Sequence, residues 1–210
     1  MDTKSVEIEL TTKCTIACPA CPRTFRRKAG DRTWDTGHLD KNIVFEVLES
    51  NDFQNVRFVG SYGDCIYHPQ FIEIMKKACV SSKKIKVETN GSHRNKKWWQ
   101  QLSDLPWRDR IDFHFSIDGL EDTNHIYRKN SKWKQIMLGV ETLANGKYKP
   151  KLIWQFLVFP YNAHQVKEAE RLSKELGFDE FHASKSLRKY KSKMIFENDQ
   201  ERRNIDWNFT

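Results

Sequence analysis

The 210-residue sequence contains no apolar run long enough to cross a membrane as a helix. Its first residues, MDTKSVEIEL, have none of the character of a signal peptide. We therefore expect a cytoplasmic protein with no membrane partner. The sequence also lacks internal repeats and low-complexity tracts, and its length fits a single domain with a real core.

Cysteine is scarce, but three of the five cysteines fall within eight residues. Cys14, Cys18 and Cys21 have the spacing C-x3-C-x2-C. This group has one thiolate fewer than an ordinary four-cysteine iron–sulfur cluster or a closed zinc site requires. In the cytosol, clustered cysteines more often bind metal than form disulfides. The pattern therefore indicates a cluster with an open iron, or else a zinc site completed by His38 or Cys65.

Acidic residues are outnumbered, with 36 Lys and Arg against 28 Asp and Glu, which gives a net charge of +8. Such a charge favours an acidic partner, either nucleic acid or an acidic electron-transfer protein. Because the basic residues are scattered, solubility alone explains the charge equally well. The run RTFRRK, at Arg23–Lys28, directly follows the cysteines and is the most informative basic segment.

Strand patterns alternate with helix patterns along the chain. The segments with strand character are Ser5–Thr11, Asn55–Gly60, Lys84–Thr89, Ile111–Ile117, Leu152–Phe159 and Phe178–Ala183. The segments with helical character are Leu39–Glu49, Pro69–Val80, a Lys- and Trp-rich stretch after Gly91, Trp133–Ala144 and Ala163–Leu176. Repeated strand–helix units predict an α/β fold with parallel strands. Six units predict a partial (β/α)6 TIM-like barrel over residues 1–185, with residues 186–210 as a helical or flexible extension of the same domain.

Unusual residue strings follow five of the six predicted strands. They are the cysteine group, Ser61–Asp64, Asn90–Gly91, Ser116–Gly119 and Pro160–Asn162. In parallel α/β folds, functional groups gather at the carboxyl ends of the strands. Taken alone, Asn90–Gly91 and Ser116–Gly119 are ordinary turn signals, so their shared position carries the argument.

The segment CTIACPAC, in the loop after the first predicted strand, resembles the radical S-adenosylmethionine superfamily. The string CPACPR, at Cys18–Arg23, is similar to the form common among members with a C-terminal auxiliary-cluster (SPASM) domain. The resemblance implies one [4Fe-4S] cluster held by Cys14, Cys18 and Cys21, whose fourth iron binds S-adenosylmethionine. It also implies an oxygen-sensitive enzyme that cleaves this cofactor reductively to methionine and a 5′-deoxyadenosyl radical, which abstracts hydrogen from a substrate.

Further resemblances suggest residues that bind S-adenosylmethionine. Gly60-Ser61-Tyr62-Gly63-Asp64, followed by His68-Pro69, resembles the family's GGE segment, which receives the methionine ammonium. Thr89-Asn90-Gly91 matches its TNG segment, and Ser116-Ile117-Asp118-Gly119 its S-x-D-G segment. Arg128 occupies the place of an arginine that pairs with the methionine carboxylate, and Val158 is a candidate for packing against adenine. In Ser61, Tyr62 and Asp64 the chain departs from the usual Gly-Gly-Glu arrangement.

The reaction beyond cofactor cleavage is left open by the sequence. No cysteine follows Cys79, so we expect no second cluster. The substrate is a peptide or protein, a nucleoside or a small metabolite, and the electron donor an acidic flavodoxin or ferredoxin. No substrate-specific acid or base is predicted. Two alternatives are a basic, zinc-bearing nucleic-acid-binding module and an inactive scaffold of the same ancestry.

Overall fold

In the computed structural model, residues 4–35, 37–107 and 109–185 are described, and their strands form one six-stranded sheet. The strands are β1 (Ser5–Ile8), β2 (Asn55–Phe58), β3 (Lys84–Thr89), β4 (Ile111–Ser116), β5 (Lys151–Val158) and β6 (Glu180–Lys185). Each strand pairs in parallel with the next in sequence order. This architecture confirms the predicted partial (β/α)6 barrel.

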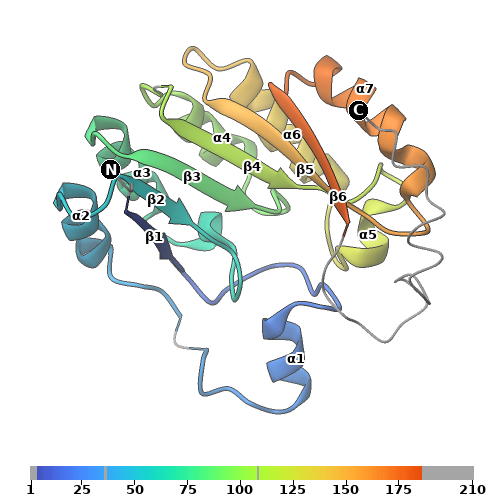
Figure 1. The fold of residues 1–210 in the computed structure, drawn as a ribbon, viewed down its shortest axis with the longest axis horizontal. Coiled ribbons are helices and arrows are strands. Elements are labelled where there is room, and N and C mark those ends of the chain that lie inside the picture. The colour runs from blue at the N-terminus through green and yellow to red at the C-terminus, as the bar shows by residue number, and fades with distance from the viewer. Residues whose placement is uncertain (1–3, 36, 108, 186–210) are drawn as a thin grey trace.

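Helices line one face of the sheet (Figure 1). They are α2 (Lys41–Glu49), α3 (Phe71–Val80), α4 (Lys96–Ser103), α6 (Trp133–Ala144) and α7 (Val166–Glu175). Two shorter helices, α1 (Pro22–Lys28) and α5 (Asn124–Tyr127), lie near the carboxyl ends of the strands instead (Figure 1). Single 3-10 turns at Cys65–Tyr67 and Ala163–Gln165 precede α3 and α7.

Alternation along the strands separates an apolar face from a polar one. Phe113 and Phe115 of β4 and Trp154 of β5 are fully buried in the main core. The side chains that alternate with these along the strands point to the opposite, concave face. This face carries His114 and Gln155. The apolar face packs against the helices, so the polar face lines the inside of the partial barrel.

The predicted boundaries differ from the structure mainly at strand and helix ends. Strand β1 ends at Ile8, and Thr11, inside the predicted strand, forms an isolated antiparallel bridge with His38. The short helices α1 and α5 were not predicted, because neither is long enough to show an apolar period. Residues 186–210, predicted as an extension, lie outside the described residues. Among the described helices, none has the length and apolar character to span a membrane.

Candidate active site

A cavity of about 560 Å³ opens at the carboxyl ends of the strands, and Cys14, Cys18 and Cys21 all line it. Residues from six later segments meet them there. Those predicted from the sequence are Gly60, Tyr62, Gly63, Asp64, Asn90, Ser116 and Arg128. The structure therefore gathers segments from Cys14 to Lys185 around one space, as expected for the top of a parallel sheet.

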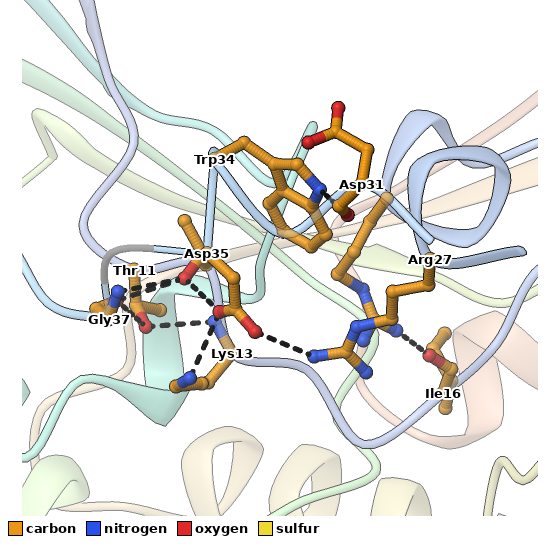
Figure 2. Close-up of polar contacts among 10 residues, drawn as sticks. Thr11, Lys13, Ile16, Arg27, Asp31, Trp34, Asp35 and Gly37 are labelled. Atoms are coloured by element: carbon orange, nitrogen blue, oxygen red, sulfur yellow. Dashed lines mark hydrogen bonds and ion pairs between the residues drawn. The ribbon is translucent and has the colours of Figure 1, made fainter. Parts of the chain in front are cut away.

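The loop that carries the cysteines is fastened at both sides. Lys13 forms an ion pair with Asp35 at 2.9 Å (Figure 2). Thr12 donates a hydrogen bond to the same carboxylate at 2.9 Å. On the other side, the Ala17 N–H donates to the carbonyl oxygen of Lys129 at 2.9 Å. These contacts hold the loop between the segment that follows α1 and the segment that joins α5 to α6.

The three thiols are free, and Cys14 and Cys18 are poorly suited to carry charge unaided. Burial raises the pKa of Cys14 to about 12, and burial also raises the pKa of Cys18, against the opposing effect of the Arg128 charge. Metal binding displaces the proton of a thiol, so a bound metal centre compensates this cost. Three thiols that line one cavity fit a cluster that takes three protein thiolates.

A single-ion zinc site receives no support from the described residues. Within them, no three His, Cys, Asp or Glu side chains converge as ligands of one metal ion. Of the two residues considered as a fourth zinc ligand, Cys65 donates its thiol hydrogen to the carbonyl oxygen of Glu88 at 3.0 Å. His38 packs edge-on against the ring of His68. Neither Cys65 nor His38 lines the cavity.

The Gly60–Asp64 loop lies close against the loop that leaves β1. The carboxylate of Glu9 accepts hydrogen bonds from the backbone N–H groups of Ser61 at 2.6 Å and Tyr62 at 3.3 Å. A Cβ atom on Gly63 would lie 1.8 Å from the carbonyl oxygen of Thr11. Only glycine allows this approach, which brings the second strand end against the cysteine loop.

Asp64 connects this loop to the end of β3. One carboxylate oxygen accepts hydrogen bonds from the Thr89 hydroxyl at 2.8 Å and the Ile66 N–H at 3.2 Å. The other accepts from the backbone N–H of Asn90 at 2.7 Å and from its side-chain amide. Burial raises the pKa of Asp64, although these hydrogen bonds act in the opposite direction. A carboxylate offers about four acceptor positions, so Asp64 is fully engaged by its own chain.

Asp118 and Arg128 form an ion pair between the end of β4 and the end of α5. The Arg128 Nε donates to Asp118 Oδ2 at 2.6 Å, while Asp118 Oδ1 accepts from the Leu157 N–H at 2.8 Å. Burial by itself lowers the pKa of Arg128, but the Asp118 charge reverses this, so the pKa is raised overall. The pair ties β5 to β4 and keeps a charged guanidinium in the cavity wall.

Three residues predicted for the site do not line the cavity. Ser61 is exposed, Asp118 is fully buried behind Arg128, and Val158 belongs to the main core. Because successive side chains of a strand point to opposite faces, Leu157 lines the cavity where Val158 was expected.

Sequence reasoning missed several residues of the cavity wall. They are Ile16, Arg23, Glu88, Tyr127, Gln155, Leu157, His182, Ser184 and Lys185, whereas Thr89, named in the TNG segment, does line it. Three of these residues, Glu88, Gln155 and His182, lie on different strands and point to the concave face. The alternation of side chains along each strand could have predicted this. Arg23 and Tyr127 belong to the short helices α1 and α5, which the sequence did not reveal.

The model of the radical SAM superfamily matches residues 8–178. The chain is 22% identical over 188 residues to the tungsten-containing aldehyde ferredoxin oxidoreductase cofactor-modifying protein of Pyrococcus furiosus, which covers 84% of this chain and 49% of that protein.

The fold is similar to that of Streptococcus suis SuiB bound to S-adenosylmethionine, with a TM-score of 0.72, 13% identity, and coverage of 95% of this chain and 45% of SuiB. It is also similar to anSMEcpe with bound AdoMet and Cp18Cys peptide, with a TM-score of 0.65, 19% identity, and coverage of 91% and 54%. The chain spans about half the length of these relatives.

Proposed function

The chain belongs to the radical SAM superfamily, and from this we propose that it is an enzyme that cleaves S-adenosylmethionine reductively with one [4Fe-4S] cluster. The observation that carries the proposal is the meeting of three free thiols with the ends of β2, β3 and β4 on one cavity. When bound, the cluster passes one electron to S-adenosylmethionine, whose cleavage yields methionine and a 5′-deoxyadenosyl radical that removes hydrogen from the substrate.

We propose that Cys14, Cys18 and Cys21 hold the cluster. Asn90 supports this assignment, because its side-chain amide lies 3.5 Å from the sulfur of Cys14 and can donate a hydrogen bond to it. An N–H donor beside a ligand sulfur orients it and fixes its side-chain conformation. The thiol of Cys21 donates to the carbonyl oxygen of Ser61 at 3.6 Å, a hydrogen bond that it would give up on binding iron as a thiolate.

Arg128 is proposed to bind the methionine carboxylate. Its Nε is already held by Asp118, so the outer Nη groups keep their direction when a ligand arrives. A planar guanidinium matches a carboxylate with two parallel hydrogen bonds. Asp118 then acts as a positioning residue, because it reaches the cofactor only through Arg128.

The ammonium group is proposed to lie beside the Gly60–Asp64 loop. Because Asp64 is saturated by Thr89, Asn90 and Ile66, we assign the hydrogen bonds of the ammonium to backbone carbonyl groups of the loop. Asp64 contributes its negative charge and holds the loop to β3. This role is consistent with the departure from the usual Gly-Gly-Glu arrangement.

On the far wall, Ser116 is proposed to contact the ribose and Leu157, in place of Val158, to pack against adenine. Ser116 and Leu157 line the same cavity as Arg128, from neighbouring strands β4 and β5. The side chain of Gln155 and the ring of His182 extend this wall along the concave face of the sheet. The substrate is proposed to approach from this polar side.

Anaerobic reconstitution with iron and sulfide, followed by reduction in the presence of S-adenosylmethionine, tests the proposal. We expect the broad visible absorbance of an iron–sulfur cluster and release of 5′-deoxyadenosine. Cys18→Ser should lose both, whereas Cys79→Ala, a buried cysteine of α3 in the main core, should keep both. A Cys18→Ser protein that still released 5′-deoxyadenosine would contradict the assignment.

For the electron donor, we propose an acidic flavodoxin or ferredoxin that docks on α1. Arg26 and Arg27 keep about 43% and 36% of their side-chain surfaces exposed. Attraction between exposed charges weakens with salt, so the rate of cluster reduction by flavodoxin should fall as ionic strength rises. An unchanged rate between 0.05 and 0.5 M salt, about 14 Å to 4 Å in screening length, would exclude this docking mode.

The first substrates to test are peptides, because the SuiB and anSMEcpe structures include complexes with peptides. Nucleosides and small metabolites form the second set. Mass spectrometry should detect a product that has lost hydrogen only in samples that also contain 5′-deoxyadenosine.

A further inference from the structure

Arg23 carries a buried positive charge without an ionic partner among the described residues. Its exposed fraction is 3%, and it lines the cavity. It donates one hydrogen bond, to the carbonyl oxygen of Ile16, which is the dashed line that ends on Ile16 in Figure 2. A guanidinium has five N–H donors. A single neutral carbonyl group accepts only part of their hydrogen bonds and does not balance the positive charge.

Two other arginines of the cavity wall and the sheet have ionic partners, whereas Arg94, near the end of β3 and outside the cavity, donates to the carbonyl oxygens of Ile66 and His68. Arg128 is held by Asp118, and Arg57 forms ion pairs with Glu7 and Glu88. An unpaired buried charge is strongly unfavourable, because the protein interior replaces the water that would otherwise solvate it. The environment of Arg23 therefore calls for an anion in the cavity.

The position of Arg23 identifies which anion it faces. The residue follows Cys21 by two positions, and its partner Ile16 lies between Cys14 and Cys18 in sequence. Arg23 therefore lies in the first turn of α1, and its side chain is hydrogen-bonded to the cysteine loop. The methionine carboxylate, by contrast, has Arg128 as its partner at the end of α5.

We propose that Arg23 is the counter-ion of the cluster and raises its reduction potential. This inference rests on the proposed function. Three thiolates around a [4Fe-4S] core of formal charge two plus give a net charge of one minus. One electron from a low-potential donor makes it two minus, and no bond forms or breaks. A fixed positive charge stabilises the reduced form more than the oxidised form, which makes the cluster easier to reduce by its electron donor.

The test is a reductive titration of the reconstituted protein without S-adenosylmethionine, followed by electron paramagnetic resonance. The variants are Arg23→Gln, which removes the charge, and Arg23→Lys, which keeps it. Arg171→Gln is the matched control, because Arg171 lies on the exposed surface of α7 and loses the same charge. For Arg23→Gln we expect an equilibrium constant of reduction at least tenfold smaller, about 59 mV for a one-electron couple. Arg23→Lys should retain most of the wild-type potential, and Arg171→Gln all of it.

Three results would overturn the inference. The first is an Arg23→Gln cluster with the wild-type potential. The second is equal loss of bound iron in Arg23→Gln and Arg23→Lys, which would mean that the guanidinium only supports the Ile16 carbonyl. The third is an unchanged potential with weaker binding of S-adenosylmethionine, which would assign Arg23 to the cofactor. If Arg23→Gln takes up no iron while Arg23→Lys forms a cluster of wild-type potential, the charge is required and the inference stands.

Failure of the proposed function gives a different result. A wild-type protein that forms no iron–sulfur cluster would reject the function, whereas a wild-type cluster with an unaffected Arg23→Gln potential would reject only the role of Arg23.

Discussion

The ion pair between Asp118 and Arg128 illustrates how single residues build the cavity wall. Asp118 is fully buried, and its side chain contacts both Arg128 and the backbone of Leu157. The sequence motif named Asp118 and Arg128 as neighbours of the cofactor, yet it contained no sign that they bind each other. Removing one member of such a pair leaves a buried charge without its partner.

Asp118→Asn is therefore expected to lower the free energy of unfolding by about 3 kcal/mol. The measurement is urea denaturation of the metal-free protein. The control is Asp31→Asn, which breaks the exposed pair of Asp31 with Arg26 and should lower the free energy of unfolding much less. Equal effects of the two substitutions would show that the Asp118–Arg128 pair is not desolvated as described.

His114 is a second buried polar residue, and it gives a pH-dependent prediction. Burial is the main cause that lowers its pKa to about 4, with Lys86 and His182 adding to this and Glu88 and Glu180 opposing it. Its Nδ1 has no hydrogen-bond partner within the described structure. A depressed pKa means that the unfolded chain binds more protons, so stability is lost as the pH falls from about 6.5 to about 4.

Across this window the His114 contribution should fall by roughly 2–3 kcal/mol. Urea denaturation of wild type and His114→Gln at pH 7 and pH 4.5 isolates it, because the other titrating groups are common to both proteins. The gap in stability between the two proteins should narrow or reverse at the lower pH. A gap independent of pH would show that His114 titrates normally.

At the scale of elements, helix α6 packs against α4 through a glycine. A Cβ atom on Gly139 would lie 2.6 Å and 2.7 Å from two carbon atoms of the Trp99 ring, which is fully buried. The ring cannot move far, because it also packs against Trp98 and Phe115. Gly139 therefore sets the distance between two helices of the outer layer.

Gly139→Ala tests this packing. Alanine improves helix propensity by about 1 kcal/mol, but overpacking a filled core costs about 1–3 kcal/mol. The rigid ring favours the second effect, so we expect net destabilisation of about 1 kcal/mol by thermal or urea unfolding. Lys134→Ala, at an exposed position of the same helix, should change stability by less than about 0.5 kcal/mol. A more stable Gly139→Ala protein would contradict the close packing of α4 and α6.

At the scale of the whole molecule, the cavity links segments that are distant from one another within the sheet. The sheet itself joins each strand only to its direct neighbours. The cysteine loop follows β1, Arg128 follows α5, and Leu157 lies in β5. A ligand that contacts all three stabilises the folded state over the unfolded one, because the unfolded chain does not gather them.

We expect S-adenosylmethionine to raise the Tm of the cluster-loaded protein. At a concentration of a hundred times Kd, the added stability is about 2.7 kcal/mol. Arg128→Gln should reduce this increase at the same concentration, while its iron content stays at the wild-type level. A wild-type Tm that did not respond to S-adenosylmethionine would show that the cofactor does not bridge these segments.

The sequence by itself determined the order of strands and helices, because period-2 and helical apolar patterns follow from the two backbone geometries. It also determined the group of three cysteines and the motifs that resemble the radical SAM superfamily, a resemblance that the comparison with the family model supports. Leu39–Glu49 and Trp133–Ala144 were predicted within two residues of α2 and α6. These are local properties, which neighbouring residues fix.

Only the tertiary structure decided which side chains share the cavity. It placed Val158 in the core and Leu157 at the cavity. It hydrogen-bonded Asp64 to Thr89 and Asn90. It also buried Arg23 beside the cysteines. The physical reason is that contact and burial depend on which distant segments meet, and no local pattern reports the partner of a charge. The sequence therefore determined the chemical groups available to this protein, and the packing of the sheet, helices and loops determined how they face one another.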